Sequence, residues 1–252
     1  MTINKQKVDT AVILAAGMGT RLNAIIGEKP KGLLMIDDQE IIKTSLERLL
    51  QFGIRSIIIV TGFQRDQYVN LLTDKYPMVQ FVQNDDFAIT GSMHSLYLAK
   101  SRIQHDFLLL ESDLLYENRA ITELLDFAQP EAILLSGKTG SGDEVYVYGK
   151  SGKIELITKE IIHQHQRQGE LVGVSKISTD LLTVMCDYYL SEIPFPSDFH
   201  YEDCLSAVSG QYEIPYHCVE DLVWTEIDDP HHYQRALDKI LPKLKKRESD
   251  SQ

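Results

Sequence analysis

The order of apolar and polar residues in the first half of the chain predicts strands that alternate with helices. Continuous apolar runs that end in turns are typical of strands buried on both faces of a parallel sheet. Such runs occur at Thr10–Ala16, Arg55–Thr61, Val79–Gln83, Asp106–Glu111 and Glu131–Ser136. Apolar residues at helical spacing lie between these runs and predict helices over 39–52, 65–74, 92–100 and 118–128. This alternation predicts an α/β fold with a doubly wound, mostly parallel sheet.

The second half of the chain has a different pattern. Glu144–Tyr148 and Lys153–Thr158 flank the turn residues 150–152, which predicts a hairpin. A further strand is expected over 171–177, and helices over 179–190 and 233–240. Because no linker is visible, we expect one domain over 1–252, with halves at about 8–137 and 138–241 and a small antiparallel extension in the second half. The charged tail 242–252 is expected to fray.

Composition and charge exclude several classes of protein. The 252 residues are 43% hydrophobic and 25% charged, which is ordinary for a globular chain. There are 25 Lys and Arg against 37 Asp and Glu, and the resulting net charge of −12 argues against a nucleic-acid partner. No apolar run is long enough to span a bilayer, and the first residues lack the apolar core of a signal peptide. Three scattered cysteines, none in a CxxC pair, fit a reducing compartment, so we expect a cytoplasmic protein without a membrane partner.

A glycine-containing loop follows the first strand. Residues 14–22 read LAAGMGTRL, so that a buried strand leads into two glycines and then Arg21. Glycines allow close approach of the backbone, whose amides can then surround a phosphate, and Arg21 can add a forked cation. Leu22 occupies the place of the third glycine in a dinucleotide fingerprint, and no Walker motif is present. The pattern indicates a phosphate loop, although a simple turn from strand to helix would give the same residues.

The loop and the residues after it resemble a known family. LAAGMGTRL followed by KPKGLL at 29–34 is similar to the Rossmann-like nucleotidyltransferases that activate sugar phosphates and small alcohol phosphates. The resemblance implies that Arg21 and Lys31 are catalytic, binding the triphosphate and stabilising charge at the α-phosphate. For Lys29 both a direct role and a solvated position stay open. The resemblance also implies a set of nucleotide-binding residues, extended by a second similar segment at 83–96: Leu14, Ala15, Ala16, Gly17, Gly19, Thr20, Asn84, Gly91 and Ser92.

Two carboxylates are candidates for a magnesium site. Asp113 lies just beyond the buried strand that ends at Glu111, where an α/β sheet binds its ligands. Mg²⁺ is commonly held by one or two carboxylates together with phosphate oxygens. The segment Trp224–Pro230 (WTEIDDP) resembles a late motif of the same family, and by that match Asp228 is the second Mg²⁺ ligand. A turn at Asp113 and a helix cap at Asp229, before Pro230, are the structural alternatives.

The acceptor is expected to bind the second half. Aromatic and acidic side chains suit an ammonium group, and the sugar motifs of the larger family members are missing. The proposed acceptor-binding residues are Tyr146, Lys159, Tyr201, Glu202, Asp203 and Trp224. Strand alternation, a helix start and surface charge would explain the same residues without an acceptor.

In its length and in its aromatic and acidic residues, the chain resembles compact cytidylyltransferases for phosphocholine or aminoethylphosphonate. The expected reaction is Mg²⁺-dependent transfer from CTP to such a phosphate or phosphonate acceptor, with release of pyrophosphate. The alternatives are a sugar-1-phosphate nucleotidyltransferase and a non-catalytic nucleotide-binding protein.

Overall fold

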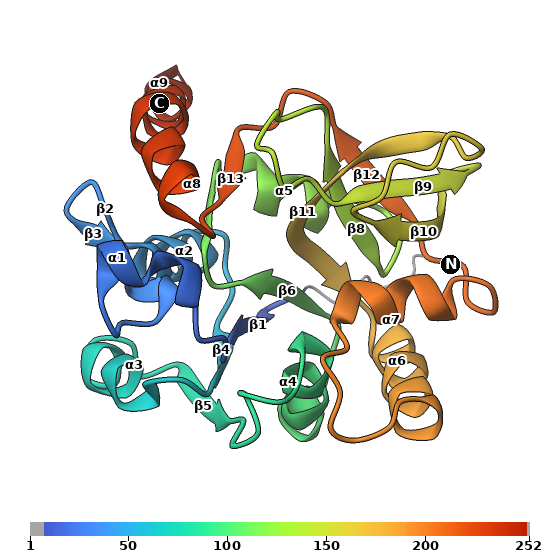
Figure 1. The fold of residues 1–252 in the computed structure, drawn as a ribbon, viewed down its shortest axis with the longest axis horizontal. Helices are drawn as coiled ribbons and strands as arrows, with labels where there is room; N and C mark the ends of the chain where they lie inside the picture. The colour runs from blue at the N-terminus through green and yellow to red at the C-terminus, as the bar shows by residue number, and fades with distance from the viewer. Residues whose placement is uncertain (1–7, 251–252) are drawn as a thin grey trace.

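A computed structural model describes residues 8–250 and shows a central nine-stranded sheet (Figure 1). Four strands pair in parallel in the order β6-β1-β4-β5, and these are β6 (Phe107–Glu111), β1 (Thr10–Ala15), β4 (Ser56–Thr61) and β5 (Val79–Gln83). Alternate residues of β1 pack into separate apolar clusters, one on each side of the sheet. This two-sided burial explains why the strands read as continuous apolar runs.

The second half extends the same sheet with antiparallel strands. β11 (Arg167–Ile177) runs antiparallel to β6 and also pairs with the hairpin strand β9 (Tyr146–Lys150), which continues to β10 (Lys153–Thr158). β8 (Ala132–Ser136) is antiparallel to β11 and parallel to β12 (Tyr216–Val219). The predicted fold, a mostly parallel sheet with a small antiparallel extension, is confirmed.

Helices cover both faces of the sheet. The helices α2 (Ile41–Gln51), α3 (Arg65–Leu72) and α5 (Arg119–Asp126) contribute to one apolar cluster. The opposite cluster contains residues from α4 (Ser92–Ala99), α6 (Thr179–Glu192) and α7 (Tyr201–Val208). None of the helices between Val8 and Asp250 combines the length and the hydropathy that crossing a membrane requires.

Several short elements were not expected from the pattern. They are η1 (Thr20–Leu22), α1 (Asn23–Ile26), η2 (Lys31–Leu33), β2 (Met35–Ile36), β3 (Gln39–Glu40) and η3 (Lys100–Arg102). Two further short strands, β7 (Leu114–Tyr116) and β13 (Trp224–Glu226), form a separate antiparallel pair. The amide of Ile227 continues this pairing by donating to the carbonyl oxygen of Asp113 at 3.1 Å. The pair therefore brings two distant parts of the sequence side by side.

The C-terminal segment is helical rather than frayed. α8 (Pro230–Arg235) begins earlier than expected, because the Asp229 side chain caps it by accepting from the amide of His232 at 2.8 Å. A five-residue π-helical segment, η4 (Ala236–Ile240), leads into α9 (Leu241–Asp250). The prediction that 242–252 frays is therefore wrong for residues 242–250, and the last two residues lie outside the described part.

The charges of α9 are paired with other segments of the chain. Glu248 accepts from Arg48 at 2.6 Å, and Arg247 donates to Asp221 at 2.6 Å. Leu244 is only 2% exposed and lies in an apolar cluster with residues from the start of the chain. One buried leucine and these long-range pairs hold a helix whose sequence alone appears polar.

We expect Leu244→Ala to lower the free energy of unfolding by about 2–3 kcal/mol, since it removes a buried leucine from a packed cluster. Urea unfolding followed by circular dichroism would measure this. Lys246→Ala, on the exposed side of α9, is the control and should change the value by less than about 0.5 kcal/mol. Equal effects of the two substitutions would contradict the docking of α9.

Candidate active site

The glycine loop after β1 lies against Lys31. Leu14, Ala15 and Ala16 are buried, whereas Gly17 and Thr20 are exposed. Gly19 has a φ of 60°, and a Cβ placed on it would lie 2.5 Å from Cγ of Lys31. A side chain at position 19 would thus be strained twice, by the backbone conformation and by this contact. Glycine is required there because Lys31 passes directly over the loop.

Lys31 connects the two predicted magnesium ligands. Its Nζ donates to Oδ2 of Asp113 at 2.7 Å and also to Oδ1 of Asp228. The β7–β13 pair places these two carboxylates next to each other. Burial disfavours the charged ammonium, but Asp113 and Asp228 outweigh this and raise the pKa of Lys31 above its ordinary value. Lys31 is therefore charged and lies between two carboxylates.

Asp228 is held ionised by its cationic neighbours. Burial alone would raise the pKa of its carboxyl, but Lys31, and more weakly Arg21, lower it below the ordinary range. Nη2 of Arg21 lies 3.2 Å from Asp228, and Nη1 lies 3.5 Å from Asp143. Nζ of Lys159 in turn donates to Asp143 at 2.7 Å. Alternating charges thus extend from Lys31 to Lys159.

Asp143 begins the candidate acceptor segment 143–148, but it is not among the residues proposed for the site. Its loop, between β8 and β9, gave no signal beyond an acidic residue after Gly142. Only the fold shows that it joins the predicted catalytic Arg21 to the predicted acceptor residue Lys159.

A group of carboxylates lies close to Lys31. Oxygen atoms of Glu111, Asp113 and Glu226 lie within 4.8 Å of one another. Burial, with Glu202 and Asp113 nearby, raises the pKa of Glu111 to about 8. Burial and the neighbours Glu111 and Asp113 likewise raise the pKa of Glu226 well above its usual range. Carboxylates crowded in this way are a favourable environment for a cation.

Glu226 was missed although it stands in the quoted WTEIDDP segment. The match covers Glu226-Ile227-Asp228 but assigns a role to Asp228 alone, although residues two apart in an extended segment share a face. That periodicity was the signal that could have identified Glu226.

Tyr201 and Glu202 lie at the start of α7 and approach the same carboxylates. The hydroxyl of Tyr201 donates to Oε1 of Glu111 at 2.7 Å. Oε2 of Glu202 is buried, and it has no hydrogen-bond partner within the described residues. Burial, above all, raises the pKa of the Glu202 carboxyl. Buried carboxylate oxygens usually accept a hydrogen bond, and this one lacks a donor among the described residues.

The other predicted acceptor residues are engaged elsewhere. Asp203 is exposed and accepts from the amide of His200 at 3.0 Å, as part of the cap of α7. The ring of Tyr146 lies 5.0 Å from the guanidinium carbon of Arg167. Nε1 of Trp224 donates to Oγ of Ser136 at 2.8 Å, and its indole is buried. Their acceptor roles stay predictions.

The second predicted nucleotide segment makes contacts within the protein. Asn84 is buried and donates to Thr90 at 3.2 Å and to Ser95 at 3.1 Å. Gly91 lies against the backbone of Phe199, and Oγ of Ser92 accepts from the amide of Tyr201 at 3.0 Å. These contacts hold the N-terminal end of α4 against the N-terminal end of α7. Nucleotide binding by Asn84, Gly91 and Ser92 stays a prediction.

Comparisons with curated proteins identify relatives that act on several substrates. The chain is 24% identical to the CMP-5'-(3-aminopropyl)phosphonate synthase of Streptomyces rubellomurinus, covering 92% of this chain and 39% of the relative. It is 30% identical to the choline-phosphate cytidylyltransferase of Streptococcus pneumoniae, over 57% of this chain and 66% of the relative. A UTP–glucose-1-phosphate uridylyltransferase of Haloferax volcanii is 30% identical over 41% and 42% of the two chains. The chain thus spans between about two fifths and two thirds of these relatives.

A solved structure and a family model agree with the fold. The inositol-1-phosphate CTP transferase of T. maritima superposes with a TM-score of 0.81 at 20% identity, covering 96% of each chain. Residues 11–172 match the family model of the MobA-like NTP transferase domain. The resemblance seen in the glycine loop is confirmed, and the chain belongs to the family of MobA-like NTP transferase domains.

Proposed function

We propose that the chain transfers a cytidylyl group from CTP to a small phosphate or phosphonate that carries an amine, with release of pyrophosphate. The observation that carries this proposal is the Lys31–Asp113–Asp228 cluster beside the glycine loop. Relatives named for aminopropylphosphonate and choline phosphate support the choice of acceptor.

The proposed chemistry needs charge neutralisation and positioning more than proton transfer. The attacking phosphate or phosphonate oxygen is ionised at neutral pH, so no general base is required. Phosphoryl groups in such displacements carry charge on several oxygens, and fixed cations lower the barrier. Lys31 would neutralise charge at the α-phosphate, while Arg21, which is more exposed, would hold the outer phosphates. The amides of the glycine loop would complete the phosphate contacts.

The carboxylates fit a divalent cation. The carboxylate oxygens of Glu111, Asp113 and Glu226 lie within 4.8 Å of one another, and burial, together with these neighbouring acids, raises the pKa of Glu111 and Glu226. Asp113 and Asp228, with Glu226 beside them, would hold Mg²⁺, whose ligands are oxygens. When bound, Mg²⁺ would supply positive charge to the phosphate oxygens and orient them.

An acceptor amine would satisfy Glu202. Its buried Oε2 has no partner among residues 8–250, and the carboxyl of Glu111, which accepts from Tyr201, lies nearby. An ammonium group would donate a hydrogen bond to this carboxylate and would also place a positive charge beside it. A hexose 1-phosphate would bring hydroxyl donors but no cation.

A panel of substrates tests the proposal. Pyrophosphate release would be measured with CTP and UTP, each with 3-aminopropylphosphonate, phosphocholine or glucose 1-phosphate. We expect the highest kcat/KM with CTP and an amine acceptor. A preference for glucose 1-phosphate would favour the sugar-phosphate alternative, which the Haloferax relative represents. Binding of CTP without pyrophosphate release from any pair would favour the non-catalytic alternative.

Glu202→Gln should raise the KM of the amine acceptor about five- to thirty-fold, the equivalent of losing roughly 1–2 kcal/mol of a charge-assisted contact. The KM of CTP should stay nearly unchanged. Asp203→Asn is the matched control, because Asp203 is exposed and asparagine also caps helices. Steady-state kinetics of both variants decide the point. Equal effects of the two would support an acceptor role for Asp203 as well, and no effect of either would show that these residues do not bind an amine.

A further inference from the structure

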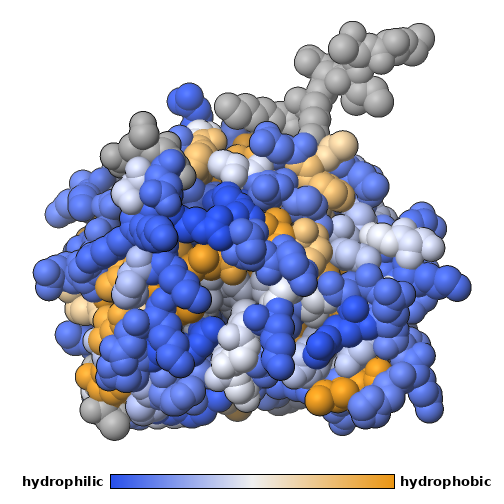
Figure 2. Space-filling view, turned by 90° about the horizontal axis from the view of Figure 1, so that it is seen from above, coloured by the Kyte–Doolittle hydropathy of each residue, from blue (hydrophilic) through white to orange (hydrophobic). Residues whose placement is uncertain are grey.

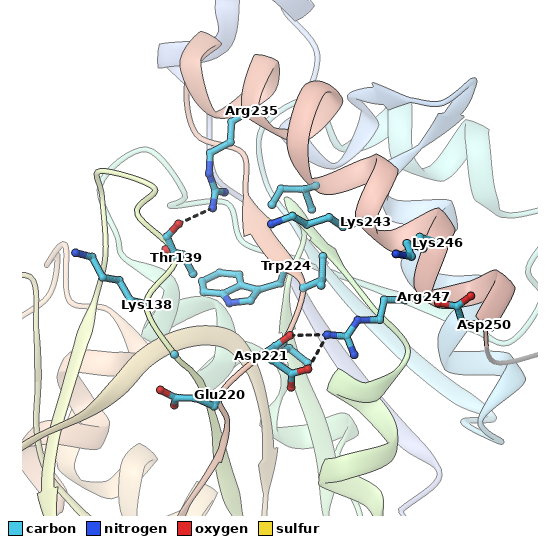
Figure 3. A pocket seen from close by; sticks show the side chains of 14 residues that line it. Lys138, Thr139, Glu220, Asp221, Trp224, Arg235, Lys243, Lys246, Arg247 and Asp250 are labelled. Carbon is cyan, nitrogen blue, oxygen red and sulfur yellow. Dashed lines mark hydrogen bonds and ion pairs between the residues drawn. The ribbon is translucent and has the colours of Figure 1, made fainter.

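A groove separate from the Lys31 cluster lies beneath α9. It has a volume of about 710 Å³ and is bounded by α9, by β13 and by the loop that follows β8. The residues that matter here are Lys138, Thr139, Trp224, Arg235, Lys243 and Lys246, and we call this surface the α9 groove (Figure 3). β11 is antiparallel to both β6 and β8, so β8 runs in the same direction as β6. β12 is parallel to β8 and therefore shares this direction. The groove therefore lies at the carboxyl edge of the sheet, where α/β proteins bind ligands.

Unpaired cations surround this groove. Lys138, Lys243 and Lys246 are exposed, and none has a carboxylate within 4 Å in the described part of the chain. Three acidic residues also line the groove, namely Glu220, Asp221 and Asp250. Asp221 pairs with Arg119 and Arg247, and within the described residues none of the three pairs with these lysines. In a chain with a net charge of −12, unpaired lysines gathered at one hollow favour an anionic ligand.

Arg235 adds a half-buried cation to the same wall. Its Nη1 donates to Oγ1 of Thr225 at 2.7 Å, and its Nη2 donates to the carbonyl oxygen of Thr139 at 3.1 Å. Neither partner is charged, and burial lowers the pKa of Arg235 below its ordinary value, although the more distant carboxylates of Glu144 and Glu170 oppose this shift in part. By contrast, Arg247 at the other end of the groove is neutralised by Asp221 (Figure 3). An anion in the groove would compensate Arg235, for which the protein provides no carboxylate within 4 Å among the described residues.

The floor of the groove is apolar. Leu222, Val223 and Ile240 line it together with Trp224, whose indole is fixed by its hydrogen bond to Ser136. Figure 2, which views the molecule from above, shows patches of apolar surface among the hydrophilic residues of that face. A fixed indole with aliphatic neighbours suits a planar or apolar portion of a ligand.

We propose that the α9 groove binds a small phosphorylated molecule with a planar part, of the nucleoside monophosphate type, in addition to the substrates of the Lys31 cluster. The phosphate would lie among Lys243, Lys246 and Arg235, and the planar part would lie toward Trp224. The inference rests on the groove itself and does not require the proposed reaction.

The single tryptophan of the chain makes the groove observable. Trp224 fluorescence would be titrated with CMP and, separately, with inorganic phosphate. We expect a saturable change with CMP and weaker binding of inorganic phosphate, which lacks the planar part. The double substitution Lys243→Gln/Lys246→Gln should weaken CMP binding about tenfold, since it removes two charge-assisted contacts. The control Lys150→Gln/Lys239→Gln removes the same charge from exposed positions outside the groove.

The active-site variant Lys31→Ala separates the groove from the proposed nucleotide site. It should keep the CMP response of Trp224, while Lys243→Gln/Lys246→Gln should keep substrate turnover. Three outcomes would overturn the proposal: no fluorescence response of the wild-type chain at millimolar CMP, loss of the response in Lys31→Ala with its retention in the groove variant, or equal weakening by the Lys150/Lys239 control. Equal affinity for CMP and inorganic phosphate would overturn the nucleotide-like class of the ligand.

Discussion

Asp228→Asn is expected to lower kcat by about 10²–10³, the usual effect of removing one preorganised electrostatic contact from an active site. Asparagine keeps the shape of the side chain but removes the charge that Lys31 and Arg21 now approach. Asp113→Asn should have an effect of the same size, because its carboxylate faces the same ammonium. Pyrophosphate release at saturating CTP, acceptor and Mg²⁺ measures both values.

Asp229→Asn is the control for this prediction. The residue is adjacent in sequence, but its carboxylate caps α8, and asparagine caps helices equally well. Its kcat should remain within about twofold of the wild type, because the cap survives. Near wild-type turnover of Asp228→Asn would show that this carboxylate has no part in the reaction.

Lys31→Ala is expected to reduce kcat/KM for CTP by about 10²–10³ and to lower stability at the same time. Without its ammonium, two neighbouring carboxylates remain uncompensated, and breaking such a buried pair typically costs about 3 kcal/mol. Added Mg²⁺ should restore part of the stability by compensating the carboxylates. It should not restore kcat/KM, because the proposed contact of Lys31 with the triphosphate would be missing.

Lys31→Arg extends the same test. The planar guanidinium differs in shape from an ammonium, so the conservative variant should also be impaired. Lys29→Ala, exposed in the same loop, is the control and should leave both stability and CTP kinetics unchanged. Recovery of full kcat/KM in Lys31→Ala at high Mg²⁺ would reduce Lys31 to a structural counter-ion.

The main sheet was predictable from sequence because strands that are buried on both faces consist of continuous apolar residues. A strand such as β1 has no exposed position along its length, and its apolar run has no competing interpretation. The glycine loop was predictable for a similar local reason, since Gly19 is required by its own backbone conformation.

The parts that escaped prediction depend on distant partners. β7 and β13 are each three residues long, and neither would be recognised as a strand without the other. α9 lacks a broad apolar stripe, and its charges gain their partners only in the folded chain, as with Glu248 and Arg48. Asp143 joins the site through a loop, and loops carry no periodic signal.

The β7–β13 pair also determines when the site can form during synthesis. Domains fold as their N-terminal parts emerge, and the parallel strands before Asp113 are made first. Asp228, however, follows β11 and α7 in the sequence, so the second carboxylate is added only after these elements have been synthesised. A partly made chain would present Lys31 and Asp113 without their partner. The proposed Mg²⁺ site, which needs both carboxylates, would therefore be completed only after residue 228 has been synthesised, and chains truncated before this residue should lack it.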